Sequence, residues 1–87
     1  MNLSCKSKSV ENTLRRDFLL KEFLLTRNHA EFSFADSAGQ DYSLELGVQE
    51  DGSFLASISK KGSVLPHKHY LSRVSAYYIQ RTLRGLN

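Results

Sequence analysis

The chain has 87 residues, nine acidic and twelve basic side chains, a net charge of +3 and an apolar content of 40%. A chain of this length forms one domain with a modest core. Its single Cys excludes an intramolecular disulfide and is typical of a reducing compartment, so we expect a cytoplasmic protein. No segment approaches the roughly 20 apolar residues of a membrane span, and we expect no membrane partner.

The charged side chains are distributed unevenly along the chain. Residues 29–51 contain six acidic side chains and neither Lys nor Arg, whereas residues 52–87 contain six basic side chains and neither Asp nor Glu. This asymmetry indicates one acidic and one basic surface. The basic surface favours a nucleic acid or an acidic protein surface as its partner.

The N-terminal residues divide into a tail and the start of a domain. Residues 1–8 are polar and rich in Ser and Lys, which is typical of a flexible N-terminal tail. Residues 9–87 are expected to form a single α+β domain. Ser9 is a suitable N-cap for a helix that extends to about Arg27.

The second half of this predicted helix, residues 18–25, is apolar nearly all round. A surface helix normally has one apolar stripe, but Leu19 and Phe23 form a second stripe opposite the first. The second stripe is buried either within the domain or against another chain. In the latter case Leu19 and Phe23 form a protein interface, and a homodimer or a hetero-complex assembles through this helix.

Three segments after the helix alternate apolar and polar residues with the period of a strand. They are residues 30–35, 42–48 and 54–59. Residues typical of turns separate them, and Asp51-Gly52 in particular favours a tight turn with positive φ. The pattern predicts a three-stranded antiparallel meander whose apolar face buries four side chains: Leu44, Leu46, Phe54 and Ile58.

The last predicted element is a helix from about Pro66 to Leu86, since Pro is favoured at the first position of a helix. One face of this helix is apolar. The opposite face is a stripe that alternates phenol rings with guanidinium groups, at Tyr70, Arg73, Tyr77, Arg81 and Arg84. The stripe is either a solvated surface or a binding surface, on which Arg contacts phosphates and Tyr stacks on bases.

These elements predict a two-layer α+β sandwich of order α-β-β-β-α, with both helices on the apolar face of the meander. The other face of the sheet is small, polar and acidic, and can face water. Internal repeats and a linker between domains are both absent from the sequence.

No residue pattern indicates catalysis. His67-Lys68-His69 is the only cluster of His, and residues two apart on a helix point in different directions. Cys5 has no neighbouring base in the sequence, and nothing indicates that two carboxylates converge. We therefore expect no enzyme activity, no metal and no cofactor.

The charge pattern favours a small non-catalytic nucleic-acid-associated binding protein. The contacts to nucleic acid or partner would come from the basic, Tyr-interleaved last helix and the lysines before it: Lys60, Lys61, Lys68, Tyr70, Arg73, Tyr77, Arg81 and Arg84. The alternative is a protein-binding regulator or inhibitor, of phage or plasmid type, that acts on a host nucleic-acid machine. In that case the basic helix competes for an acidic surface, or acidic residues 36–51 mimic phosphates toward a basic partner.

Overall fold

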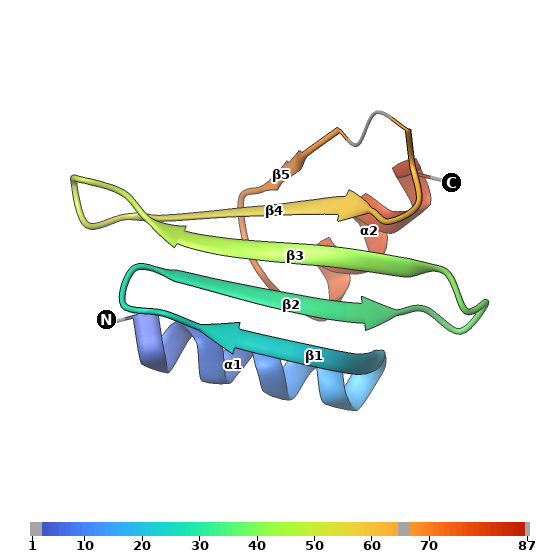
Figure 1. Ribbon diagram of the computed structural model, residues 1–87, viewed down its shortest axis with the longest axis horizontal. Coiled ribbons are helices and arrows are strands. Elements are labelled where there is room, and N and C mark those ends of the chain that lie inside the picture. Colours follow the sequence, from blue (N-terminus) through green and yellow to red (C-terminus); the bar gives the residue numbers. More distant parts are fainter. Residues whose placement is uncertain (1–2, 65–66, 87) are drawn as a thin grey trace.

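The computed structural model describes residues 3–64 and 67–86, which form a helix, five strands and a second helix. The five strands build one antiparallel sheet in the order β1-β2-β3-β4-β5 (Figure 1). The α+β class and the two terminal helices agree with the prediction, but the sheet has five strands where three were predicted. The elements are α1 (Leu3–Asp17), β1 (Leu19–Leu25), β2 (His29–Ala35), β3 (Asp41–Val48), β4 (Phe54–Lys60), β5 (His69–Leu71) and α2 (Ala76–Leu86).

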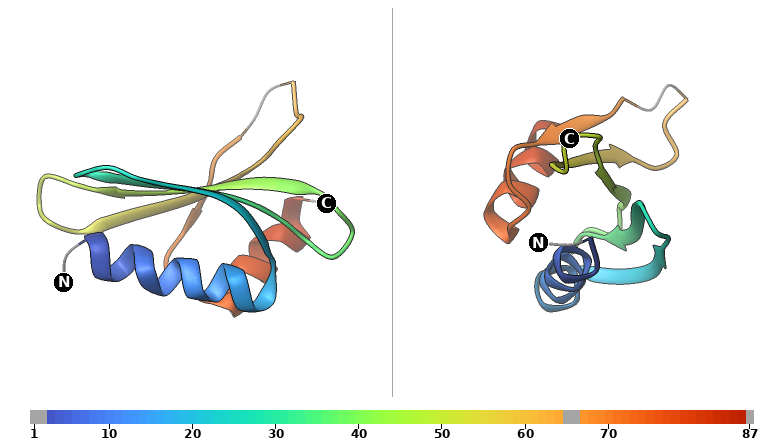
Figure 2. Two further views of the ribbon diagram at one scale, coloured as in Figure 1. Left: turned by 60° about the horizontal axis from the view of Figure 1, so that its bottom comes forward. Right: turned by 90° about the vertical axis from the view of Figure 1, so that its left-hand side faces the viewer.

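Both helices lie on the same side of the sheet, which we call the inner face (Figure 2). The hydrophobic core lies between the sheet and the helices, because the strands and the helices both turn apolar side chains toward this space. Its large fully buried members come from α1, the three central strands and α2: Val10, Leu14, Phe32, Phe34, Tyr42, Leu44, Leu46, Ile58 and Ile79.

The three central strands are the three that the alternating pattern predicts. Leu44 of β3 lies opposite Phe32 of β2 and Ile58 of β4, so the register brings predicted core residues together. Leu44, Leu46 and Ile58 are fully buried, and Phe54 is half-buried against the core. The predicted apolar face of the three central strands is therefore confirmed.

The first helix begins and ends earlier than predicted. Residues 3–8, expected in a flexible tail, form the first turns of α1, while Met1 and Asn2 lie outside the described residues. Leu3 and Ser7 are buried together with Val10 and Leu14, and this spacing of four and three residues makes one helical face. The Ser- and Lys-rich composition concealed this face, because residues 3–8 contribute only Leu3 and Ser7 to it and their other side chains lie outside it.

Residues 19–25, predicted as the apolar end of the first helix, form strand β1 instead. The register between β1 and β2 shifts between Leu20 and Glu22, which makes Lys21 the extra residue of a β-bulge. The bulge interrupts the period of two, and apolar residues lie on both faces of the strand, so the segment resembles a helix in sequence. Pairing with β2 overrides this local preference, as tertiary contacts commonly do.

The last helix is shorter than predicted, and its expected first half contains a strand. β5 pairs with β4 over Ala56–Ile58, and α2 begins only at Ala76. Pro66, expected at the start of the helix, lies outside the described residues. A strand of three residues is too short to show alternation, so its pairing partner decides its conformation.

The turn between β3 and β4 has the backbone predicted for Asp51-Gly52. Gly52 has a φ of +86°, and its amide donates to the carbonyl of Gln49 at 3.0 Å. The Ser53 hydroxyl, at 2.6 Å, and the Ser53 amide, at 2.9 Å, donate to the Asp51 carboxylate and lower its pKa. These hydrogen bonds help to hold a turn that requires positive φ at one residue.

We expect Gly52→Ala to lower the free energy of unfolding by about 1–2 kcal/mol, because an L side chain clashes with its own backbone at positive φ. Urea denaturation measures the change. Gly85→Ala is the matched control, since Gly85 lies in α2 with open space around it and should gain up to about 1 kcal/mol. Loss of stability in both variants would contradict the account.

Candidate interaction site

The eight predicted binding residues lie on several elements, and the five of them that were predicted as one helical stripe do not share a helix. Tyr77, Arg81 and Arg84 belong to α2, while Arg73 lies in the bend that precedes it. The other four lie at the end of β4, in the turn after it, and in or just before β5: Lys60, Lys61, Lys68 and Tyr70. The predicted single stripe is wrong because β5 belongs to the sheet and not to the helix.

The lysines near β5 lie beside acidic or polar groups of the outer face, which is the face of the sheet away from the helices. The Lys68 ammonium is 3.0 Å from the Glu45 carboxylate, whose hydrogen bond and charge raise the pKa of Lys68. The Lys61 ammonium donates to the Ser33 hydroxyl. The outer face is therefore mixed in charge, and these two lysines do not add to a uniformly basic surface.

The exposed side of α2 keeps three of the predicted residues together. Tyr77, Arg81 and Arg84 are spaced four and three residues apart and are all exposed, with Tyr77 at 67%. Ile79 and Leu83, on the opposite side, are buried in the core. Within residues 3–64 and 67–86, neither Arg81 nor Arg84 forms an ion pair with a carboxylate. We call the exposed side of α2 that contains Tyr77, Arg81 and Arg84 the α2 face. It is the part of the predicted basic surface that the structure keeps together.

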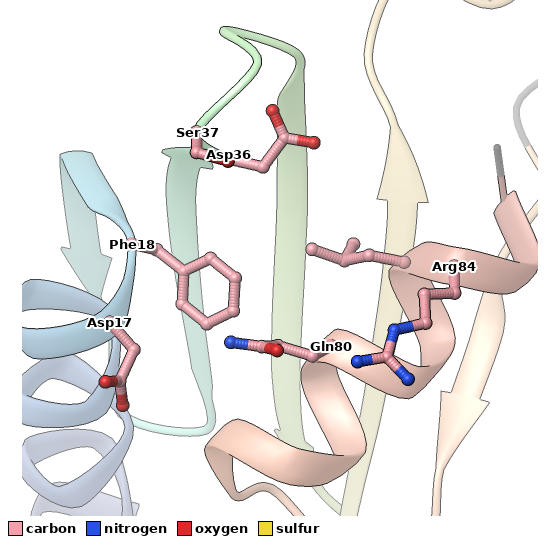
Figure 3. A pocket seen from close by; sticks show the side chains of 7 residues that line it. Asp17, Phe18, Asp36, Ser37, Gln80 and Arg84 are labelled. Carbon is pink, nitrogen blue, oxygen red and sulfur yellow. The ribbon is translucent and has the colours of Figure 1, made fainter.

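A cavity of about 440 Å³ lies between the end of α1, the β2–β3 loop and α2 (Figure 3). Phe18 and Gln80 point toward each other across it, and Arg84 lies on its α2 side. Its carboxylates already have partners. Asp36 accepts hydrogen bonds at 3.0 Å from the amides of two residues of its loop, and Asp17 is 3.0 Å from its neighbour Arg16. The two carboxylates thus stabilise local structure. Among the described residues, Arg84 is the only cationic side chain that lines the cavity.

β1, a strand at the edge of the sheet, contains more exposed large apolar side chains than any other described element (Figure 1). The described residues include nine large apolar side chains that are exposed, and four of them belong to this one strand. They are Leu19 at 61%, Phe23 at 36%, Leu24 at 57% and Leu25 at 44%. Isolated exposed apolar residues are normal, but a group of them on a free strand edge is a candidate interaction surface.

The two residues predicted as an interface, Leu19 and Phe23, are both in this group but do not share a face. Leu19 lies opposite Ala35 and Phe23 opposite Phe32, and positions three apart on β2 face opposite sides of the sheet. Phe23 is on the inner face, where its ring stacks on Phe32 with centroids 4.7 Å apart. The expected helical stripe is therefore an edge strand with apolar residues on both faces.

The sequence did not single out Leu24 and Leu25 as parts of an interface, nor the central Lys21-Glu22 pair. Among the described residues the Glu22 carboxylate has no ion pair, whereas the Lys21 ammonium is 2.8 Å from Asp41 of β3. The sequence did contain a sign of this surface, because residues 18–25 are apolar nearly all round. Its interpretation as a helix concealed a free edge, because an α-helix satisfies its own backbone groups and a strand does not.

Within the described residues, no group of three or more His, Cys, Asp or Glu side chains is arranged to hold a metal ion. Cys5 is exposed on α1, far along the chain from His67 and His69. In the same part of the chain, no helix combines the length and the apolar character that crossing a membrane requires. Comparison with protein-family models, with curated proteins and with solved structures finds no match to this chain.

Proposed function

We propose that this protein is a small non-catalytic protein-binding module that acquires a partner strand along the free edge of β1. In strand addition, the main-chain groups of an edge strand pair with an extended segment of another chain, and side chains on alternate positions supply specificity. The observation that carries the proposal is the exposure of Leu19, Phe23, Leu24 and Leu25 on one seven-residue edge strand.

The other edge of the sheet is much less suited to this role. β5 has three residues and is short, which is one way in which proteins protect a sheet edge. β1 has seven residues, contains no Pro, and has one charged pair among five apolar side chains. An edge of this length and composition supports pairing with another strand, and the regulator predicted from the sequence would bind its target there.

The test of this proposal is capture of partners from nuclease-treated extracts of the source cells by wild-type protein and by Leu24→Glu. Leu24 is 57% exposed on the free edge, so its replacement should abolish capture while the circular dichroism spectrum stays unchanged. Val64→Glu is the matched control, since Val64 is 95% exposed outside the sheet and should keep full capture. Equal capture by Leu24→Glu and Val64→Glu would contradict binding through β1.

Nucleic-acid binding through the α2 face is the second candidate function. Two arginines and Tyr77 share one exposed side of α2, and neither arginine forms an ion pair with a carboxylate of the described residues. Arg forks can contact phosphate oxygens in pairs, and the Tyr77 ring offers a stacking face. The α2 face and the β1 edge are separate surfaces, so a protein partner and a nucleic acid could be bound together.

A further inference from the structure

We propose that the strand that pairs with the free edge of β1 is β1 of a second copy of this chain, antiparallel to the first, about a two-fold axis at the bulge. This inference rests on the proposed function, since it names the partner of the same edge. In this arrangement Leu19 lies opposite Leu24 of the second copy, Leu20 opposite its Phe23, and Lys21 opposite its Glu22. The sheets of the two copies then form one continuous antiparallel sheet.

The faces of the outer pair of leucines agree with this symmetry. Antiparallel strands related by a two-fold axis perpendicular to the sheet keep the side chains of paired residues on one face. Leu19 lies opposite Ala35 of β2, and Leu24 lies opposite Glu31. Positions 31 and 35 are four apart and face the same side, so Leu19 and Leu24 share the outer face. Without the bulge, residues five apart would face opposite sides.

The inner pair obeys the same rule. Leu20 lies opposite Phe34 and Phe23 opposite Phe32, and both of these phenylalanines belong to the core on the inner face. Leu20 and Phe23 are three apart in sequence, and only the extra residue Lys21 brings them to one face. The bulge therefore makes the segment from Leu19 to Leu24 self-complementary on both faces.

Charge favours this register over the symmetric registers whose axis lies at Phe23 or at Leu24. With the axis at the bulge, each Lys21 lies opposite Glu22 of the other copy. Moving the axis to Phe23 would place Glu22 opposite Leu24 of the second copy, and moving it to Leu24 would place Glu22 opposite Thr26. Opposite charges across a strand pair stabilise it, whereas a carboxylate against a leucine loses water without a partner.

Sedimentation velocity over a range of concentrations tests the pairing with charge variants. Wild type should form dimers, and Glu22→Lys should raise the dimer dissociation constant roughly tenfold or more, since lysines then face lysines. A one-to-one mixture of Glu22→Lys and Lys21→Glu should recover the heterodimer, because each lysine again faces a glutamate. Glu50→Lys, in an exposed turn outside β1, is the matched control and should dimerise like wild type.

Cysteine cross-linking tests the register in a Cys5→Ser background. Residues directly opposite in an antiparallel pair have Cα atoms about 4.5–5.5 Å apart, which suits a disulfide. A mixture of Leu19→Cys and Leu24→Cys proteins should cross-link to each other on mild oxidation, while each alone should not. Cross-linking of Leu24→Cys to itself would place the axis at Leu24 and overturn the proposed register.

The results separate this inference from the function on which it rests. A protein that stays monomeric at all concentrations and gives no cross-link overturns self-pairing, even if Leu24→Glu abolishes capture of another protein. In that case binding through β1 stands with a different partner. A wild-type dimer that Glu22→Lys leaves intact also overturns the inference, because the dimer must then use another surface.

Discussion

Phe32→Ala is expected to lower the free energy of unfolding by about 3–5 kcal/mol, which would leave a domain of this size largely unfolded. Phe32 is fully buried at the centre of the inner face, opposite Leu44 of β3 and beneath the ring of Phe23. Its removal leaves a cavity that a regular sheet cannot close by a small shift, and the lost contacts add to the lost burial. Urea denaturation followed by circular dichroism measures the change.

Phe23→Ala is the matched control for this prediction. It removes the other ring of the same stack, with centroids 4.7 Å apart, but from an edge strand where the ring is 36% exposed. We expect a loss of about 1–2 kcal/mol in dilute protein, because less surface is buried and water can fill the space. A loss as large as that of Phe32→Ala would mean that β1 is part of the core and not a free edge.

The double variant Arg81→Glu with Arg84→Glu is expected to weaken binding to DNA or RNA roughly 100-fold at 50 mM salt, if the α2 face contacts phosphates. Each phosphate contact releases condensed counterions, so two lost contacts should also reduce the slope of log K against log salt by about two units. Both arginines are exposed on α2, and the fold should remain intact. Fluorescence anisotropy with a labelled oligonucleotide at several salt concentrations measures both quantities.

The control for this effect changes the net charge equally at other places. Arg15→Glu with Arg27→Glu reverses two exposed arginines, one on α1 and one in the turn between β1 and β2. Loss of the exposed pair between Arg15 and Glu11, at 2.8 Å, should cost no more than about 1 kcal/mol. If this control weakens binding as much as the α2 variant, then only net charge matters and the α2 face is a solvated surface.

The centre of the sheet could be predicted from the sequence because its residues carry their own signals. Leu44 and Leu46 alternate with polar neighbours, and this period of two is typical of a strand with one buried face. Asp51-Gly52 supplies a turn with positive φ, which fixes how the next strand returns. These are local properties of the chain, and they predicted three strands, their turns and the buried face.

The basic side chains of residues 52–87 were predicted to form one surface, and only part of that surface exists. Residues 52–87 contain no acidic side chain, but Lys68 lies against Glu45, which is 23 residues earlier in the chain. Composition shows which charges a segment contains. It does not show which charges from another segment lie beside them, since the pairing of β4 with β5 and of β3 with β4 decides this.

The sequence by itself determined the α+β fold class, the central meander and the apolar character of residues 18–25. Only the tertiary structure decided that those residues form a strand with a free edge, because the hydrogen-bond partners of β1 lie in β2 and the bulge at Lys21 breaks the alternation. It likewise decided that β5 joins β4, since three residues are too few to specify a strand. A helix forms its backbone hydrogen bonds within itself, whereas an edge strand forms them with residues distant in sequence. The pattern of a single segment cannot identify those distant partners.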